Sequence, residues 1–102
     1  MQRAASMNSI PTCTRNVIVG LESGLHLTPS SQIVQLAQKF SSEFLIRKGD
    51  KTVDGKSMLD LMQLAAEHGE TLLLEARGDD AAEAVVAIAR LFERNFNLDQ
   101  PG

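Results

Sequence analysis

Hydrophobic residues recur along the chain at spacings that change between those of strands and those of helices. Residues 14–21 contain a short β-branched run and predict a strand: Val17, Ile18 and Val19. In residues 29–40, apolar side chains repeat at helical spacing and predict a helix: Ile33, Leu36, Ala37 and Phe40. Thr28 is a candidate N-cap of this helix, and Pro29 suits its first position.

Two further strands are predicted on either side of a tight turn. Residues 44–46 and 52–53 are β-type segments, and residues 47–51 between them include Gly49 and Asp50, which favour turns. These segments therefore predict a hairpin. Residues 71–76 are again apolar and predict a fourth strand.

Two more helices begin at recognisable polar positions. Ser57 with Asp60 three residues later resembles a capping box, and the helix it opens is expected to end near Gly69. Asp79 and Asp80 place negative charge at the start of the last helix. Its apolar stripe consists of Ala81, Val85, Ile88, Ala89 and Phe92.

The predicted order is βαββαβα, and a four-stranded sheet with its helices on one face is the α+β arrangement that buries one side of the sheet. A chain of 102 residues has the usual length of one domain. We expect this domain to span residues 14–96. Residues 1–13 lack either periodicity and are expected to form a disordered N-terminal tail, and residues 97–102 a C-terminal tail.

Composition and charge exclude several classes of function. The net charge is −3 with acidic and basic residues mixed, so nucleic acid is not expected as a partner. No segment approaches the roughly 20 apolar residues that span a membrane, and the N-terminus does not resemble a signal peptide. Cys13 is the one cysteine and the two histidines are far apart, so we expect no disulfide, metal or cofactor, and a cytoplasmic protein.

The loop from Gly24 to Pro29 carries the candidate chemistry. It places His26 just before a predicted helix, where unpaired backbone N–H groups and the helix dipole favour an anion. Histidine can act as a neutral nucleophile near pH 7, so His26 is a candidate phosphoryl acceptor. Thr28, Ser30 and Ser31 are candidate phosphate-binding residues. The alternative is a surface histidine that happens to precede a helix.

Two motifs in register resemble the HPr family, the small histidine phosphocarriers of the bacterial phosphoenolpyruvate-dependent phosphotransferase system. Gly24-Leu25-His26 followed by Pro29 matches the family motif G-L-H-x-R-P at all but one defined position. Residues 53–62, VDGKSMLDLM, resemble the second signature, in which a serine opens a short helix. The segment VQLAQKF at residues 34–40 resembles the first helix of the family, and the resemblance covers residues 14–96.

This resemblance implies an HPr-like open-faced β-sandwich with a four-stranded antiparallel sheet. It also implies that His26 accepts phosphate from enzyme I, charged by phosphoenolpyruvate, and passes it to an acceptor protein. The protein would then be a monomeric carrier rather than a self-sufficient catalyst. One departure stands out, because Thr28 occupies the position where the family has an arginine that can bridge phosphate.

The resemblance also implies a regulatory and a docking role for the second signature. Ser57 is expected to cap its helix. In Gram-positive-type HPr proteins the equivalent serine is the target of HPr kinase/phosphorylase, so Ser57 is also a candidate regulatory site. Apolar residues near His26 are candidate partner-docking residues: Leu27, Met58, Leu59 and Met62. A second hypothesis is an HPr-like regulatory binding module, controlled through Ser57, that does not relay phosphate efficiently.

Overall fold

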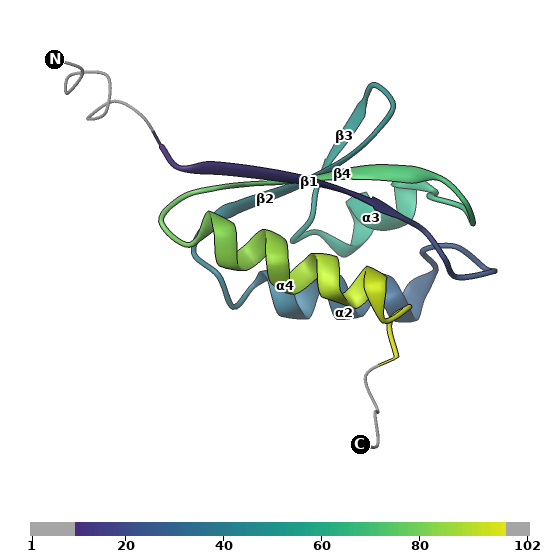
Figure 1. Ribbon diagram of the computed structural model, residues 1–102. Helices are drawn as coiled ribbons and strands as arrows, with labels where there is room; N and C mark the ends of the chain where they lie inside the picture. Colours follow the sequence, from purple (N-terminus) through teal and green to yellow (C-terminus); the bar gives the residue numbers. More distant parts are fainter. Residues whose placement is uncertain (1–9, 98–102) are drawn as a thin grey trace, which may run out of the picture.

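The computed structural model describes residues 10–97 and contains one four-stranded antiparallel sheet covered on one side by three helices (Figure 1). The elements are β1 (Thr12–Ile18), α2 (Leu27–Ala37), β2 (Glu43–Lys48), β3 (Lys51–Asp54), α3 (Met58–Leu64), β4 (Thr71–Arg77) and α4 (Ala81–Glu93). The strand order is β1-β4-β2-β3. The α+β class and the βαββαβα order are therefore confirmed.

The bounds of the first strand, β1, differ from those expected. Thr12 and Cys13, expected in the N-terminal tail, belong to β1 because they pair with Arg77 and Ala76 of β4. The strand ends at Ile18 rather than at residue 21. Residues 10, 11 and 97 of the expected tails are described and belong to no helix or strand, and residues 1–9 and 98–102 lie outside the described residues.

The hairpin was predicted correctly, with Gly49 and Asp50 in the turn between β2 and β3. Helix α3 ends at Leu64, earlier than expected, because the next residue, Ala65, adopts a left-handed conformation with φ of 55°. A left-handed residue ends the run of helical hydrogen bonds without requiring glycine, although it is strained for alanine. The chain from Ala65 to Glu70 therefore forms a separate turn between α3 and β4.

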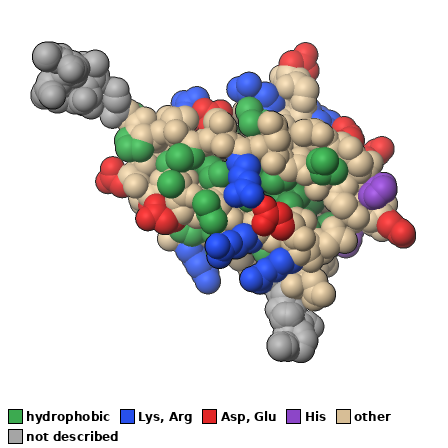
Figure 2. Space-filling model, viewed as in Figure 1, with side chains coloured by type: hydrophobic (Ala, Val, Ile, Leu, Met, Phe, Trp, Pro, Cys, Tyr) green, Lys and Arg blue, Asp and Glu red, His purple; other side chains and the backbone are tan. Residues whose placement is uncertain are grey.

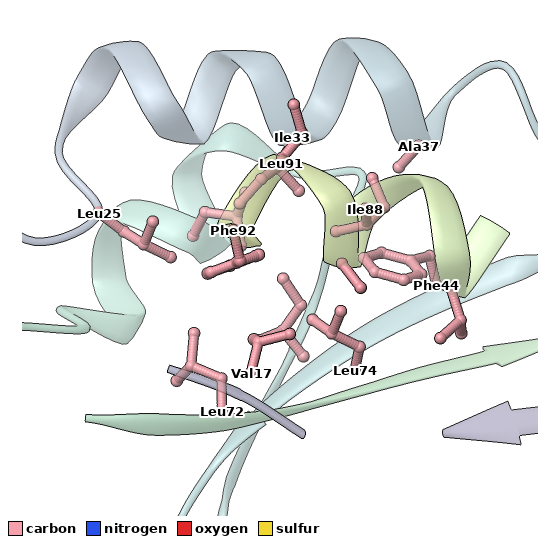
Figure 3. Packing of buried hydrophobic residues seen from close by; sticks show 14 of the residues in the cluster. Val17, Leu25, Ile33, Ala37, Phe44, Leu72, Leu74, Ile88, Leu91 and Phe92 are labelled. Carbon is pink, nitrogen blue, oxygen red and sulfur yellow. The ribbon is translucent and has the colours of Figure 1, made fainter. Parts of the chain in front are cut away.

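The core lies between the inner face of the sheet and the three helices. Alternate residues of β4, Leu72, Leu74 and Ala76, are completely buried, as the period of a half-buried strand requires. Figure 3 shows side chains of the sheet and of the helices pointing into one layer between them. Burial of these apolar surfaces is the main favourable contribution to folding.

A carboxylate joins two loops at one end of the sheet. Asp80 is the N-cap residue of α4, but its side chain makes no capping bond to that helix. It accepts hydrogen bonds instead from the N–H groups of Ser41 and Ser42, both at 2.9 Å, and from the Ser42 hydroxyl at 2.5 Å. The Ser42 hydroxyl and then the Ser41 N–H lower the pKa of Asp80 from 3.8 to about 2.

Replacing Asp80 with asparagine is expected to destabilise the protein and to reduce its sensitivity to acid. Because the pKa of Asp80 is lower in the folded state, its contribution to stability is complete above the ordinary value of 3.8 and is lost as the pH falls towards about 2. Urea denaturation at a series of pH values would measure both effects. Asp79→Asn is the matched control, and equal behaviour of the two variants would contradict this role of Asp80.

Candidate functional site

The loop that carries His26 rests on the turn formed by residues 65–70. The N–H of Leu25 donates to the carbonyl oxygen of Ala66 at 2.9 Å, and the N–H of Gly69 donates to Val19 at 2.8 Å. The Leu25 side chain is buried and points into the core (Figure 3). Backbone bonds and one apolar anchor therefore determine where His26 lies. No local signal in the sequence indicates the role of Ala66, because it is far from His26 along the chain.

Glycine is required at position 24 for two independent reasons. Its φ is +72°, in the left-handed region that side chains disfavour. A Cβ added there would also lie 2.5 Å from the Ala66 carbonyl oxygen and 3.0 Å from the Cα of Glu67. The first glycine of the motif therefore allows the loop to approach the 65–70 turn closely.

His26 is exposed and is itself the N-cap residue of α2, with φ of −85° and ψ of −163°. Its carbonyl oxygen accepts the first helical hydrogen bond, from the N–H of Ser30 at 3.1 Å. The N–H groups of Leu27 and Thr28 precede that bond and have no partner within the helix, and Pro29 has no N–H. Figure 2 shows histidine side chains in purple at the right-hand edge, the end at which α2 begins in Figure 1.

The expected capping role of Thr28 was wrong. The helix begins two residues earlier than expected, so Thr28 lies in its first turn, and no side chain caps it. The residue is exposed and directly follows Leu27, so its side chain remains near the helix start. The unpaired N–H groups at the helix start are therefore those of Leu27 and Thr28.

The two serines expected to bind phosphate have hydrogen-bond partners within the protein. Ser30 is completely buried, and its hydroxyl donates to the carbonyl oxygen of Leu25 at 3.2 Å, so its assignment as a phosphate ligand was wrong. Ser31 lies further along the helix, where its hydroxyl accepts a hydrogen bond from Gln35 at 3.3 Å. Ser30 instead helps to hold the loop against the helix.

The four apolar residues expected to dock partners lie on α2 and α3, and we call them together the α2–α3 surface. Leu27 is 62% exposed, Leu59 66% and Met62 41%, whereas Met58 is half-buried against the core. A shallow pocket between the two helices is lined by Leu27, Ser31, Val34, Gln35 and Met58. The α2–α3 surface therefore combines freely exposed residues with one that also supports the core.

Ser57 caps α3 as expected. Its hydroxyl accepts a hydrogen bond from the N–H of Asp60 at 3.2 Å. The reciprocal half of a capping box is absent, because the Asp60 carboxylate accepts the N–H of Asp54, at 3.2 Å, rather than that of Ser57. Ser57 is half-buried and immediately precedes Met58 of the α2–α3 surface.

Residues 10–97 hold no group of three or more His, Cys, Asp or Glu side chains arranged for a metal ion. None of the helices in this part of the chain has both the length and the apolar character needed to cross a bilayer.

The fold and the site together define a class of protein: small α+β proteins that expose a histidine at the start of a helix. A sequence model described as "PTS HPr component phosphorylation site" matches residues 13–94. The chain therefore belongs to the HPr family of phosphocarrier proteins.

Individual relatives agree with this assignment. The phosphocarrier protein HPr of Neisseria meningitidis is 42% identical over 73 residues, which cover 72% of this chain and 82% of the relative. The HPr-like protein Crh of Halalkalibacterium halodurans is 39% identical over 80 residues, which cover 78% and 95%. A crystal structure of HPr from Thermoanaerobacter tengcongensis superposes with a TM-score of 0.81 at 34% identity, covering 86% of this chain and 99% of that one. The open-faced sandwich is confirmed by this likeness.

Replacing Gly24 with alanine is expected to destabilise the fold by about 2 kcal/mol or more, because backbone strain and a collision with Ala66 add together. Gly49→Ala is the matched control. Gly49 also has a positive φ, of 62°, but nothing lies within 4 Å of an added Cβ, so only strain of about 1 kcal/mol is expected. Urea denaturation of both variants measures the difference. Equal losses would contradict the close approach of Gly24 to the 65–70 turn.

Proposed function

We propose that His26 accepts a phosphoryl group from enzyme I, charged by phosphoenolpyruvate, and passes it to an acceptor protein. A nitrogen of the imidazole attacks the phosphorus, and the bond between phosphorus and the donor breaks as the new P–N bond forms. The observation that carries the proposal is the exposed imidazole at the N-cap of α2. A phosphoryl group on it would lie close to the N–H groups of Leu27 and Thr28.

Those N–H groups stabilise the charged product only moderately. A helix N-terminus attracts an anion through its dipole and its unpaired donors, with a typical gain of about 0.3–1 kcal/mol at an exposed position. Thr28 offers a hydroxyl but no charge, unlike the arginine of the family motif. A phosphoryl group held this loosely can leave again, which is what a carrier requires.

The α2–α3 surface is where we propose that enzyme I and the downstream acceptor dock. Leu27 follows His26 directly, so a partner that reaches the imidazole also covers this residue. Gln35 on α2 and Gln38, the C-cap residue of this helix, are exposed and uncharged, and Lys39 next to Gln38 carries a single positive charge. Apolar contact rather than charge attraction would therefore supply most of the affinity.

The test is phosphorylation of the purified protein by the enzyme I of the same organism with phosphoenolpyruvate. The wild type is expected to acquire one acid-labile phosphoryl group, and His26→Ala to acquire none. His68→Ala is the matched control, since His68 is also exposed and lies in the 65–70 turn. Its label should be unchanged. A wild type that stays unlabelled, or a label that disappears in His68→Ala instead, would refute the proposal.

A second candidate function is regulation through Ser57, and its position favours this. A phosphate on the Ser57 hydroxyl would replace the hydrogen bond from Asp60 and would bring charge to the edge of the α2–α3 surface, beside Met58. The Asp60 carboxylate nearby would repel it. We propose HPr kinase/phosphorylase as the enzyme that adds this phosphate, so that phosphorylation changes docking.

Ser57→Ala tests the structural and the regulatory role together. Loss of the cap is expected to lower the free energy of unfolding by about 1 kcal/mol. Incubation of the wild type with a cognate HPr kinase/phosphorylase and ATP should give an acid-stable label that the variant lacks. Ser41→Ala, which alters an exposed serine outside α3, should keep the label. Acid-stable label that persists in Ser57→Ala would exclude Ser57 as the target.

A further inference from the structure

Two lysines of the β2–β3 hairpin reach the end of α3. The ammonium group of Lys48 donates to the carbonyl oxygen of Ala65 at 3.1 Å, and that of Lys51 donates to Gln63 at 2.8 Å. The last carbonyls of a helix lack partners within it and carry its negative partial charge, so cations are favourable there. The hairpin therefore completes the end of a helix that is distant from it in sequence.

Lys48 differs from Lys51 because it also meets the 65–70 turn. Its ammonium nitrogen lies 3.7 Å from Oε1 of Glu70, and the two side chains are 25% and 35% exposed. The other carboxylate oxygen of Glu70, Oε2, accepts the N–H of Glu67 at 2.9 Å. Lys48 therefore interacts with both ends of the turn. It donates a hydrogen bond to Ala65 and forms an ion pair with Glu70.

The same turn supports the loop of His26. The carbonyl oxygen of Ala66, next to Ala65, accepts the N–H of Leu25, and the backbone of Ala66 and Glu67 packs against Gly24. The backbone of Glu70 accepts the N–H of Val19 at 3.0 Å. The turn therefore contacts Gly24 and Leu25, the two residues that directly precede His26.

We infer that Lys48 and Glu70 are positioning residues for His26, which act by holding the 65–70 turn in the place that Leu25 needs. This inference rests on the proposed role of His26 as phosphoryl acceptor. Neither side chain needs to touch a phosphoryl group for the effect. A polar turn of this kind opens more easily than the core, so a partly exposed ion pair can alter how often it opens.

Lys48→Met removes the ammonium group and keeps most of the apolar stem, and Lys51→Met is the matched control with the same loss of charge in the same hairpin. The first measurement is amide hydrogen exchange at Leu25 and Gly69, which needs no partner protein. Exchange at both sites is expected to be roughly two- to fivefold faster in Lys48→Met than in Lys51→Met. Lys48→Arg should restore slow exchange.

The second measurement is the steady-state rate of His26 phosphorylation by the enzyme I of the same organism with phosphoenolpyruvate. Lys48→Met is expected to lower kcat by a similar factor and to leave KM unchanged, whereas Lys51→Met leaves both unchanged. Glu70→Gln keeps an acceptor for the Glu67 N–H and loses the charge, so it should reproduce Lys48→Met more weakly.

The outcomes separate the two proposals. Equal exchange at Leu25 in Lys48→Met and Lys51→Met would overturn the inference, whatever the phosphorylation assay shows. A raised KM with unchanged kcat would make Lys48 a docking residue and would also overturn it. A wild type that enzyme I does not phosphorylate refutes the proposed function, and with it the role assigned here, even if the exchange data show that Lys48 holds the turn.

Discussion

The pairing of β4 on both sides is the constraint on which the rest of the structure depends. The strand lies in the middle of the sheet, hydrogen-bonded to β1 along one edge and to β2 along the other. Its inward residues, Leu72, Leu74 and Ala76, are completely buried. A shift of one residue in its register would turn these side chains to the open face of the sheet, so the helices could no longer pack there.

The position of His26 follows from what happens where β4 begins. The turn of residues 65–70 enters β4, and the chain leaving β1 is hydrogen-bonded to that turn before it reaches Leu25. Main-chain hydrogen bonds in this way fix the position of the loop relative to the sheet. Gly24 adds the steric condition that nothing larger fits between the two segments. The family motif thus contains a structural glycine, an apolar anchor and an exposed imidazole as successive residues.

Local patterns predicted much of this fold because the elements concerned are specified locally. The hairpin turn at Gly49 and Asp50 and the cap at Ser57 depend on neighbouring residues, and both were predicted correctly. Contacts between distant residues were not accessible in this way. The loop is hydrogen-bonded to Ala66, and the helix that follows it begins at Leu27. Because of this early start, Thr28 is not the N-cap residue, and the Ser30 side chain is turned inward. Asp80 accepts hydrogen bonds from the N–H groups of Ser41 and Ser42, and these bonds likewise have no signal in the local sequence.

The unpaired donors at the start of α2 belong to the main chain, and this has a consequence for how the protein can change over evolutionary time. Any residue except proline presents the same N–H group, so substitutions at Leu27 and Thr28 leave the attraction for an anion in place. The side chains at these two positions are exposed and make no contribution to the helix cap. The side chains at these positions can therefore diverge while the main-chain donors next to His26 persist.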